Sequence, residues 1–204
     1  MTKSICALAH KPGSTREDFQ LYYEDHHVPL AVGYFPFSAY ARNHVVGTQS
    51  FDWDTISEFW ADDIAAAAAL MAGPVGEIMA ADEERFMDRS VIASAGVEEL
   101  ILSSGPRAGE DGQRTALLIQ DSAKNVDLRS VAMDWARSLA NDLSGVSIDF
   151  TTNWTERAFP AKAVLWLPGT QQPSTPQGLL VQKLLVRRAE TPASKLIGAR
   201  SIPL

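Results

Sequence analysis

Side chains that can transfer protons are concentrated near the N-terminus of this sequence. The chain has four histidines, all within its first 44 residues: His10, His26, His27 and His44. Histidine can both accept and release a proton near neutral pH, so acid–base chemistry is expected in this part of the chain. Tyr23 and His27 are four residues apart in a segment with helical periodicity, which puts both on one inward-facing side of a helix. This shared face is compatible with an acid–base role for His27, and a histidine at the edge of a core with one backbone partner would give the same pattern.

A second set of polar side chains lies on one predicted strand. Tyr40, Arg42 and His44 alternate along a segment rich in aromatic and β-branched residues, so they share one face of it. A guanidinium on a buried face needs a carboxylate partner or a substrate anion. Glu58, on the neighbouring predicted strand, is the expected partner of Arg42, and a substrate anion is the alternative.

Aromatic residues gather around these polar groups. They are Phe19, Tyr22, Tyr23, Tyr34, Phe35, Phe37, Tyr40 and Trp60. Most aromatic side chains belong to cores, but such a concentration also suits a pocket for a flat, apolar, phenolic ligand. We therefore predict a substrate-binding set of Phe19, Tyr40, Arg42, Glu58 and Trp60.

The sequence favours chemistry without a metal or an organic cofactor. It has no His-x-His or His-x-x-x-His pair, and the predicted topology keeps His10, His27 and His44 too far apart to share one ion at about 2 Å. It also has no glycine-rich phosphate loop, no nucleotide fingerprint and no nucleophile elbow. We therefore expect neither a metal site nor a flavin site.

The first half of the chain predicts the order strand, helix, strand, strand, helix, strand. Ser14 and Glu17 have the spacing of a capping box and open the first helix, which Pro29 and Gly33 help to end. Alternating residues mark the strands, and a 3.6-residue period marks the helices. The expected strands are 4–10, 40–46, 55–61 and 97–103, and the expected helices are 14–30 and 64–86, the latter interrupted at Gly73-Pro74.

The second half repeats this order without its last helix. The expected strands are 114–120, 146–152, 163–167 and 179–188, and the expected helix is 127–143. Three prolines between residues 168 and 176 exclude a helix interior there, and the segment 104–113, rich in glycine, is the expected linker. We therefore predict an α+β fold of two tandem ferredoxin-like halves, residues 1–103 and 114–204, packed sheet against sheet. Two independent domains without a shared barrel are the alternative.

The composition of the chain limits the classes of partner and the cellular compartment that we expect for this protein. The net charge of −7 repels phosphates, so nucleic acid is not an expected partner. No apolar run approaches the roughly 18 residues needed to span a bilayer, so no membrane association is expected. The single cysteine, Cys6, lies in an apolar strand, where we expect a buried structural role and no disulfide. Without a basic stretch and a long apolar core at the N-terminus, the sequence predicts a cytoplasmic protein.

The motifs of the first half form an ordered set. It comprises Lys11-Pro12-Gly13, Phe19, Tyr22-Tyr23, His27, Pro29-Leu30, the run 40–45, Phe51-Asp52, the run 58–60, and Asp82-Glu83 before Phe86 and Asp88. The set resembles the EthD family over about residues 4–103. This resemblance implies a dimeric α/β barrel, formed here within one chain, with the second half standing in for a second subunit. Haem-binding relatives take their axial histidine from the second half, where this chain has none, so haem is not expected either.

Three functions are compatible with these features. The first is a cofactor-free cyclase, dehydratase or lyase of an aromatic or polyketide-like compound. His27 would be its general acid or base, Tyr23 would orient His27 or donate to a developing enolate, and His44 would be a second acid–base group. The second is a cofactor-independent monooxygenase of a phenolic ligand, and the third is a non-catalytic small-molecule-binding accessory protein of a degradation pathway. A homodimer is the one macromolecular assembly that we consider.

Overall fold

The structure, a computed structural model, describes residues 2–198. The first half contains β1 (Thr2–Leu8), α1 (Arg16–Tyr22), α2 (Val28–Tyr34), β2 (Ala39–Val45), β3 (Thr55–Ala61), α3 (Ile64–Ala69), α4 (Pro74–Glu83) and β4 (Ala93–Ile101). A π-helical turn, Tyr23–His27, joins α1 to α2. The second half contains β5 (Gln113–Ser122), α5 (Leu128–Ala140), β6 (Ser147–Asn153), β7 (Ala163–Pro168) and β8 (Leu179–Glu190). Short 3₁₀ turns lie at Leu70–Ala72, Arg89–Val91 and Ala193–Lys195.

The eight strands close into one antiparallel barrel, in the order β1-β3-β2-β8-β5-β7-β6-β4. Four consecutive strands of this ring, β4-β1-β3-β2, come from the first half in the ferredoxin-like order, and β6-β7-β5-β8 repeat that order in the second half. The halves join along two seams, where β2 pairs with β8 and β4 pairs with β6. The predicted fold class is therefore confirmed, and the two facing sheets are also hydrogen-bonded to each other at both edges.

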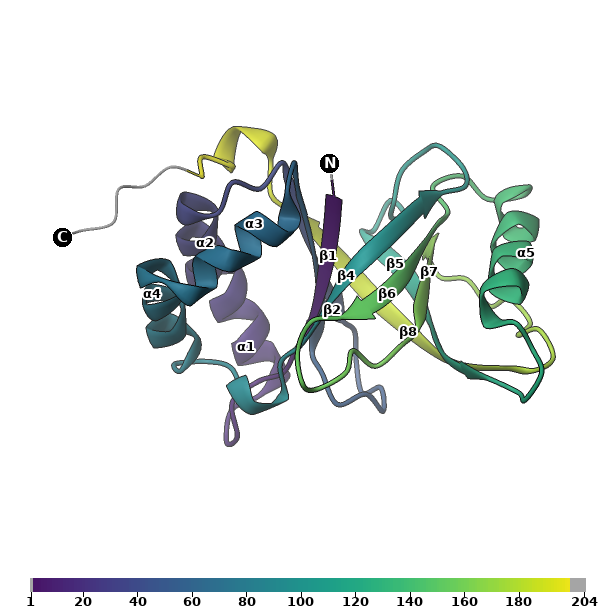
Figure 1. Ribbon diagram of the computed structural model, residues 1–204, viewed down its shortest axis with the longest axis horizontal. Helices are drawn as coiled ribbons and strands as arrows, with labels where there is room; N and C mark the ends of the chain where they lie inside the picture. The colour runs from purple at the N-terminus through teal and green to yellow at the C-terminus, as the bar shows by residue number, and fades with distance from the viewer. Residues whose placement is uncertain (1, 199–204) are drawn as a thin grey trace.

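The structure has three layers: the helices of the first half, the barrel, and helix α5 of the second half (Figure 1). The helices α1–α4 cover the outer face of the first-half sheet, and α5 covers that of the second half. Because side chains alternate along a strand, the other face of each strand fills the barrel. Part of that interior is an apolar cluster that includes Ile5, Ile56, Leu118 and Val186.

Most element boundaries differ from the sequence prediction by a few residues, and three of the differences concern the helix of Tyr23 and His27 and strand β4. The first helix is capped by Thr15, whose side chain accepts from the Asp18 amide, and not by Ser14. That helix continues through Pro29 to Tyr34. Strand β4 begins at Ala93, four residues before the predicted start, because pairing with β1 extends the strand through small residues of low β-propensity.

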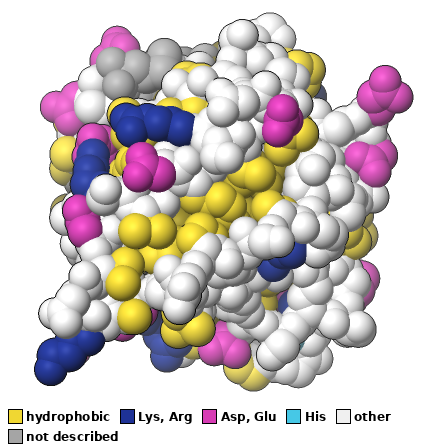
Figure 2. All heavy atoms as spheres, turned by 90° about the vertical axis from the view of Figure 1, so that its right-hand side faces the viewer, with side chains coloured by type: hydrophobic (Ala, Val, Ile, Leu, Met, Phe, Trp, Pro, Cys, Tyr) yellow, Lys and Arg dark blue, Asp and Glu magenta, His cyan; other side chains and the backbone are white. Residues whose placement is uncertain are grey.

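The second half has no helix over the prolines at 168–176, as predicted. The chain there forms a loop, and a hollow of about 290 Å³ remains between this loop and the end of α5. Its lining includes Leu139, Leu143, Leu167 and Pro173, and Figure 2 shows apolar side chains gathered in a hollow on this side of the molecule. The loss of the helix has therefore left this sheet less completely covered than that of the first half.

The segment expected as a linker is packed rather than extended. The amide of Gly145 donates to the carbonyl of Ser104, and Arg107 forms an ion pair with Glu99 across 2.6 Å. Within residues 2–198, no single helix has the length and apolar character needed to cross a membrane; the segments 64–72 and 74–83 meet that test only as a pair bent by 78°.

Candidate active site

A cavity of about 250 Å³ lies between the helices of the first half and the outer face of its sheet. Its walls are mainly apolar, with side chains that include Leu8, Phe35, Phe37, Phe59, Met79, Met87 and Ile92. A few polar side chains also line it, and His27, Tyr23, Tyr40, Glu83 and Arg89 are the ones that could take part in chemistry. This combination of an apolar enclosure and sparse polar groups is typical of a small-molecule site.

The helix that carries Tyr23 and His27 widens at these residues. The amide of Val28 donates to the carbonyl of Tyr23, five residues back, instead of four. Pro29 explains the change, because it has no amide to continue the α-helical ladder and its ring would collide with the carbonyl four residues earlier. Widened turns of this kind are frequent at functional sites. This one places the ring centroids of Tyr23 and His27 5.0 Å apart.

His27 is held by a carboxylate from α4. Its Nδ1 lies 2.8 Å from Oδ2 of Asp82, whose other oxygen accepts a hydrogen bond from the Tyr22 hydroxyl at 2.9 Å. Burial opposes ionisation of Asp82, but the hydrogen bonds from His27 and Tyr22 outweigh it and lower the pKa of this carboxyl. Since an ionised carboxylate only accepts, Nδ1 carries the proton, and the Nε2 lone pair of a neutral His27 is then available as a base. Nε2 makes no hydrogen bond to any residue in the described part of the chain.

The two tyrosine hydroxyls form a buried chain of hydrogen bonds. Tyr40 donates to the hydroxyl of Tyr23 at 2.8 Å, and Tyr23 lies 2.8 Å from Oγ of Ser57. Burial raises the pKa of both phenols, so they stay protonated at neutral pH. The hydroxyl of Tyr23 is thus bound to Ser57 and Tyr40, and Asp82, not Tyr23, orients the His27 ring through a hydrogen bond.

Glu83 and Arg89 supply further charge on the lining of the cavity. Arg89 Nε donates to Oε2 of Glu83 at 3.0 Å, and the Glu83 side chain is largely buried while Arg89 is half-exposed. Sequence reasoning assigned no role to Asp82 or Glu83. The only available signal was their place in the motif set, because nothing in their spacing relates them to a histidine 55 residues earlier.

His44 does not reach this cavity, contrary to the expected three-residue pocket. It is 1% exposed, and its Nε2 lies 2.7 Å from Oε1 of Glu24. Arg42 binds the same carboxylate with two nitrogens, at 2.9 and 2.5 Å, and donates to Thr191 at 2.6 Å. Burial alone would raise the pKa of Glu24, but the hydrogen bonds from His44 and Arg42 lower it to about 2. Arg42 and His44 therefore belong to a separate, satisfied ion cluster.

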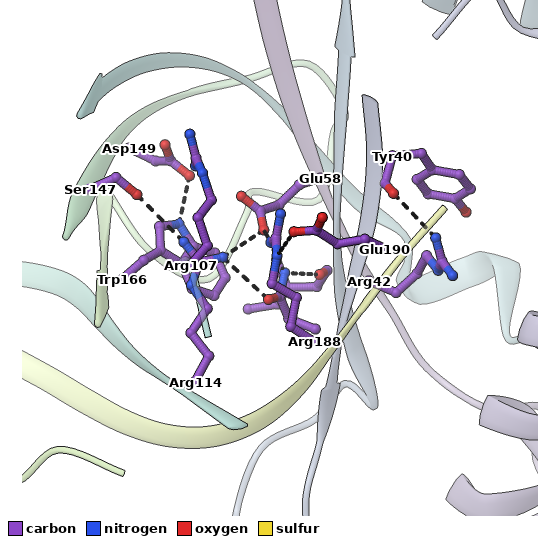
Figure 3. A network of polar contacts seen from close by, with 12 residues as sticks. Tyr40, Arg42, Glu58, Arg107, Arg114, Ser147, Asp149, Trp166, Arg188 and Glu190 are labelled. Carbon is purple, nitrogen blue, oxygen red and sulfur yellow. Dashed lines mark hydrogen bonds and ion pairs between the residues drawn. The ribbon is translucent and has the colours of Figure 1, made fainter. Parts of the chain in front are cut away.

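The expected pair of Arg42 and Glu58 is also wrong, because these residues lie on opposite faces of the sheet. In the β2–β3 ladder Arg42 faces Ser57, so Glu58 points into the barrel. There it contacts Lys3 Nζ at 2.7 Å, Arg114 Nη1 at 2.7 Å, and Arg188. Figure 3 shows Glu58 among these arginines, away from Arg42 and Tyr40.

Trp60 lies inside the barrel beside Glu58. Its indole N–H donates to Glu99 at 2.9 Å, and Lys3 Nζ lies 4.7 Å from the ring centroid. Trp60 lines a second, polar hollow at the mouth of the barrel, together with Arg107 and Arg188. Of the predicted substrate-binding set, Tyr40 therefore lines the cavity beside His27, whereas Phe19 is buried in the core against the helices.

The remaining histidines lie elsewhere. His10 Nδ1 is 2.7 Å from Asp54, and His26 packs on Tyr22 with its ring exposed. Within residues 2–198, no group of three or more His, Cys, Asp or Glu side chains could hold a metal ion. Cys6 is buried, and burial raises the pKa of its thiol to about 12. The side chains that can exchange a proton with a ligand in the cavity are therefore His27 and Glu83.

One comparison, with models of protein families, agrees with the sequence resemblance. Residues 11–90 match the family model of the EthD domain. No curated protein matches the chain. An ethyl tert-butyl ether D family protein from Bacillus halodurans C-125 is 20% identical, with a TM-score of 0.40 over 49% of this chain and 100% of that chain. A candidate chlorite dismutase is 11% identical, with a TM-score of 0.46 over 97% of each chain. A candidate monooxygenase from Lactobacillus acidophilus NCFM is 10% identical, with a TM-score of 0.48 over 92% of this chain and 93% of that chain.

Proposed function

We propose that this chain, whose residues 11–90 form an EthD domain, is a cofactor-free enzyme that moves protons on a flat, apolar small molecule. The observation that carries the proposal is the state of His27. Its Nδ1 is bound to Asp82, and its Nε2 is left without a partner among the described residues, on the wall of an apolar cavity. A neutral imidazole in this arrangement acts as a general base, and Asp82 stabilises the imidazolium that forms.

The cavity supports a proton-transfer cycle that balances without a redox partner. Nε2 of His27 takes a proton from an acidic C–H or O–H group of the ligand, and the electron pair stays on the ligand as an enolate or phenolate. His27 then returns the proton to another atom of the ligand or to a leaving hydroxyl. Glu83, on the same cavity, is the second group that can exchange a proton, in the role first given to His44. Such cycles underlie cyclisation, dehydration and isomerisation.

The apolar walls favour an aromatic or polyketide-like ligand over a sugar or a nucleotide. Phe35, Phe37 and Phe59 offer ring surface, and the buried hydroxyl of Tyr40 offers little free hydrogen-bonding capacity. The same proposal includes lyase or cyclase chemistry in the metabolism of aromatic compounds. It also includes a cytoplasmic location and assembly as a homodimer. Light scattering on the purified chain tests the homodimer.

The decisive experiment compares two adjacent histidines. A thermal-shift screen of phenolic and polyketide-like compounds identifies binders, and NMR in D₂O then follows exchange of their acidic protons and product formation. We expect His27→Ala to lower the rate of the chemical step by about 10²–10⁴-fold, the usual scale for a general base. The matched control, His26→Ala, removes an exposed imidazole one residue away and should leave the rate within about twofold.

Two outcomes would contradict the proposal. Full turnover by a folded His27→Ala variant would remove His27 from the mechanism. Binding without exchange or turnover by the native chain would favour the non-catalytic binding protein, whose cavity would be the same. An oxygen electrode in the same assay separates proton transfer from the monooxygenase alternative, because only the latter consumes O₂.

A further inference from the structure

One residue of the second half reaches the cavity of the first half. The residues that line this cavity come from positions 4–94, except for Trp154, which follows directly after β6. The second half carries no counterpart of the histidine site, since the chain has no histidine after His44. Trp154 is therefore the direct contact between the second half and the cavity.

The backbone fixes Trp154 at this place. Its amide donates to the carbonyl of Ser94 at 2.9 Å, and the amide of Ser94 donates to Thr155 Oγ1 at 2.9 Å. These two bonds extend the seam between β4 and β6 past the last paired residue, Asn153. Ser94 itself lines the cavity, so the same contact that closes the barrel holds Trp154 beside it.

Gly96 leaves the space in which the Trp154 indole packs against β4. A Cβ atom at position 96 would lie 2.7–2.8 Å from the Trp154 ring atoms Nε1, Cε2 and Cζ2, closer than real Cβ contacts. The absence of a side chain on β4 thus lets the indole pack against the strand, and any larger residue would push the ring away. The ring is held in one orientation before a ligand arrives, so little conformational entropy would be lost on binding.

The Trp154 side chain keeps part of its surface uncovered. The residue is 43% exposed, and its indole N–H makes no hydrogen bond to any residue between 2 and 198. An exposed aromatic ring at the edge of an apolar cavity offers a stacking surface and one hydrogen-bond donor, both unused by the protein.

We propose that Trp154 is a specificity-determining residue that selects flat ring systems for the cavity, and that supplying it is the functional contribution of the second half. This inference rests on one part of the proposed function, namely that the cavity beside His27 is the ligand-binding site. Offset stacking strengthens the binding of an aromatic ring by about 2–13-fold beyond the area that it buries, whereas a puckered ring of equal size gains only the burial. The difference between two such ligands therefore reports the role of Trp154.

The test measures two matched probes on the full-length chain by calorimetric titration. 2-Naphthol is flat, and 2-decalol has the same carbon skeleton and hydroxyl but is saturated and puckered. In Trp154→Ala we expect the Kd of both probes to rise because contact with the indole is lost, and that of 2-naphthol to rise about 2–13-fold more than that of 2-decalol. Trp154→Phe should keep most of the preference for the flat probe. The control is Leu180→Ala, which truncates an apolar side chain of the second half that is 59% exposed.

A second variant tests the packing of the indole against Gly96 without changing Trp154 itself. Gly96→Ala should displace the ring and lower the affinity for 2-naphthol as Trp154→Ala does. Added to Trp154→Ala, it should have no further effect, because the atoms it would strike are gone. Equal changes for both probes in Trp154→Ala, or no change, would overturn the inference and leave the His27 proposal standing. Binding of neither probe by the native chain would overturn the cavity as a ligand site, and both proposals with it.

Discussion

Glu58 is a buried carboxylate whose removal should lower the stability of the barrel. It is fully buried and contacts Lys3, Arg114 and Arg188 inside the barrel. Figure 3 shows it beside the two arginines. Burial alone would raise the pKa of Glu58, but these three cations outweigh it and hold the pKa well below its usual range. Burial lowers the pKa of Arg114 to about 10, which still leaves it charged at neutral pH.

Glu58→Gln keeps the size of the side chain and removes its charge. Lys3 would retain Glu99 and Asp149, and Arg188 would retain Glu190, but Arg114 has no other carboxylate within ion-pair distance among the described residues. Removing one partner of a buried ion pair typically costs about 3–5 kcal/mol, because the remaining charge is left uncompensated. For a chain of this length, each kcal/mol lowers Tm by about 2–4 °C, so we expect a decrease of roughly 6–20 °C.

Urea unfolding and calorimetry measure the effect, with Glu98→Gln as the matched control. Glu98 pairs with Arg129 at 2.6 Å, but both side chains are at least half exposed and the pair is screened by solvent, so its loss should lower stability far less than Glu58→Gln. Adding Arg114→Met to Glu58→Gln should restore part of the loss, since it removes the unpaired cation. If Glu58→Gln stayed within about 1 kcal/mol of the native chain, the argument from uncompensated charge would be wrong.

Three further predictions concern the cavity and its surroundings. Asp82→Asn should lower the rate of the chemical step by about 10²-fold or more, because the imidazolium of His27 loses the carboxylate that holds it; an unchanged rate would leave Asp82 a purely structural role. The pKa of Glu24 is lowered from 4.5 to about 2, so its stabilising contribution is complete above pH 4.5 and is lost as the pH falls to 2. The difference in unfolding free energy between the native chain and Glu24→Gln should shrink over that range, and a constant difference would contradict it. Cys6, with a pKa of about 12, should react with a thiol reagent at pH 8 about 10³-fold more slowly in the folded than in the unfolded chain, and equal rates would show that it is accessible.

The fold could be predicted because it depends on local patterns that repeat. Alternation along β3 and the three prolines between 168 and 176 were sufficient to place a strand and to exclude a helix. The same alternation correctly put Tyr40, Arg42 and His44 on one face. It could not say which residues of β3 shared that face, because register depends on a nine-residue connection, 46–54, without a defined turn signal. The error with Glu58 follows from this.

The site was less predictable because its contacts are not local. Asp82 meets His27 only because α4 lies against the widened turn at Tyr23–His27, and that turn depends on how the chain accommodates Pro29. Glu24 became the partner of Arg42 and His44 for the same reason: it lies on that turn and faces β2. Nothing in the sequence of the first half indicates that Trp154, a residue of the second half, lines its cavity.

Because both seams join parts of a single chain, the stability of the barrel should not depend on protein concentration. A barrel of two separate chains has a stability that depends on protein concentration, because its edges come apart by dissociation. Here the connection at 102–112 keeps β2 next to β8 and β4 next to β6 at a high effective concentration, so weakening one seam opens it locally without releasing a subunit. In a symmetric pair every substitution also appears twice, once in each copy. Covalent joining removes that constraint, so the two halves can differ: residues 168–176 form a loop, no histidine follows His44, and the cavity lies in the first half.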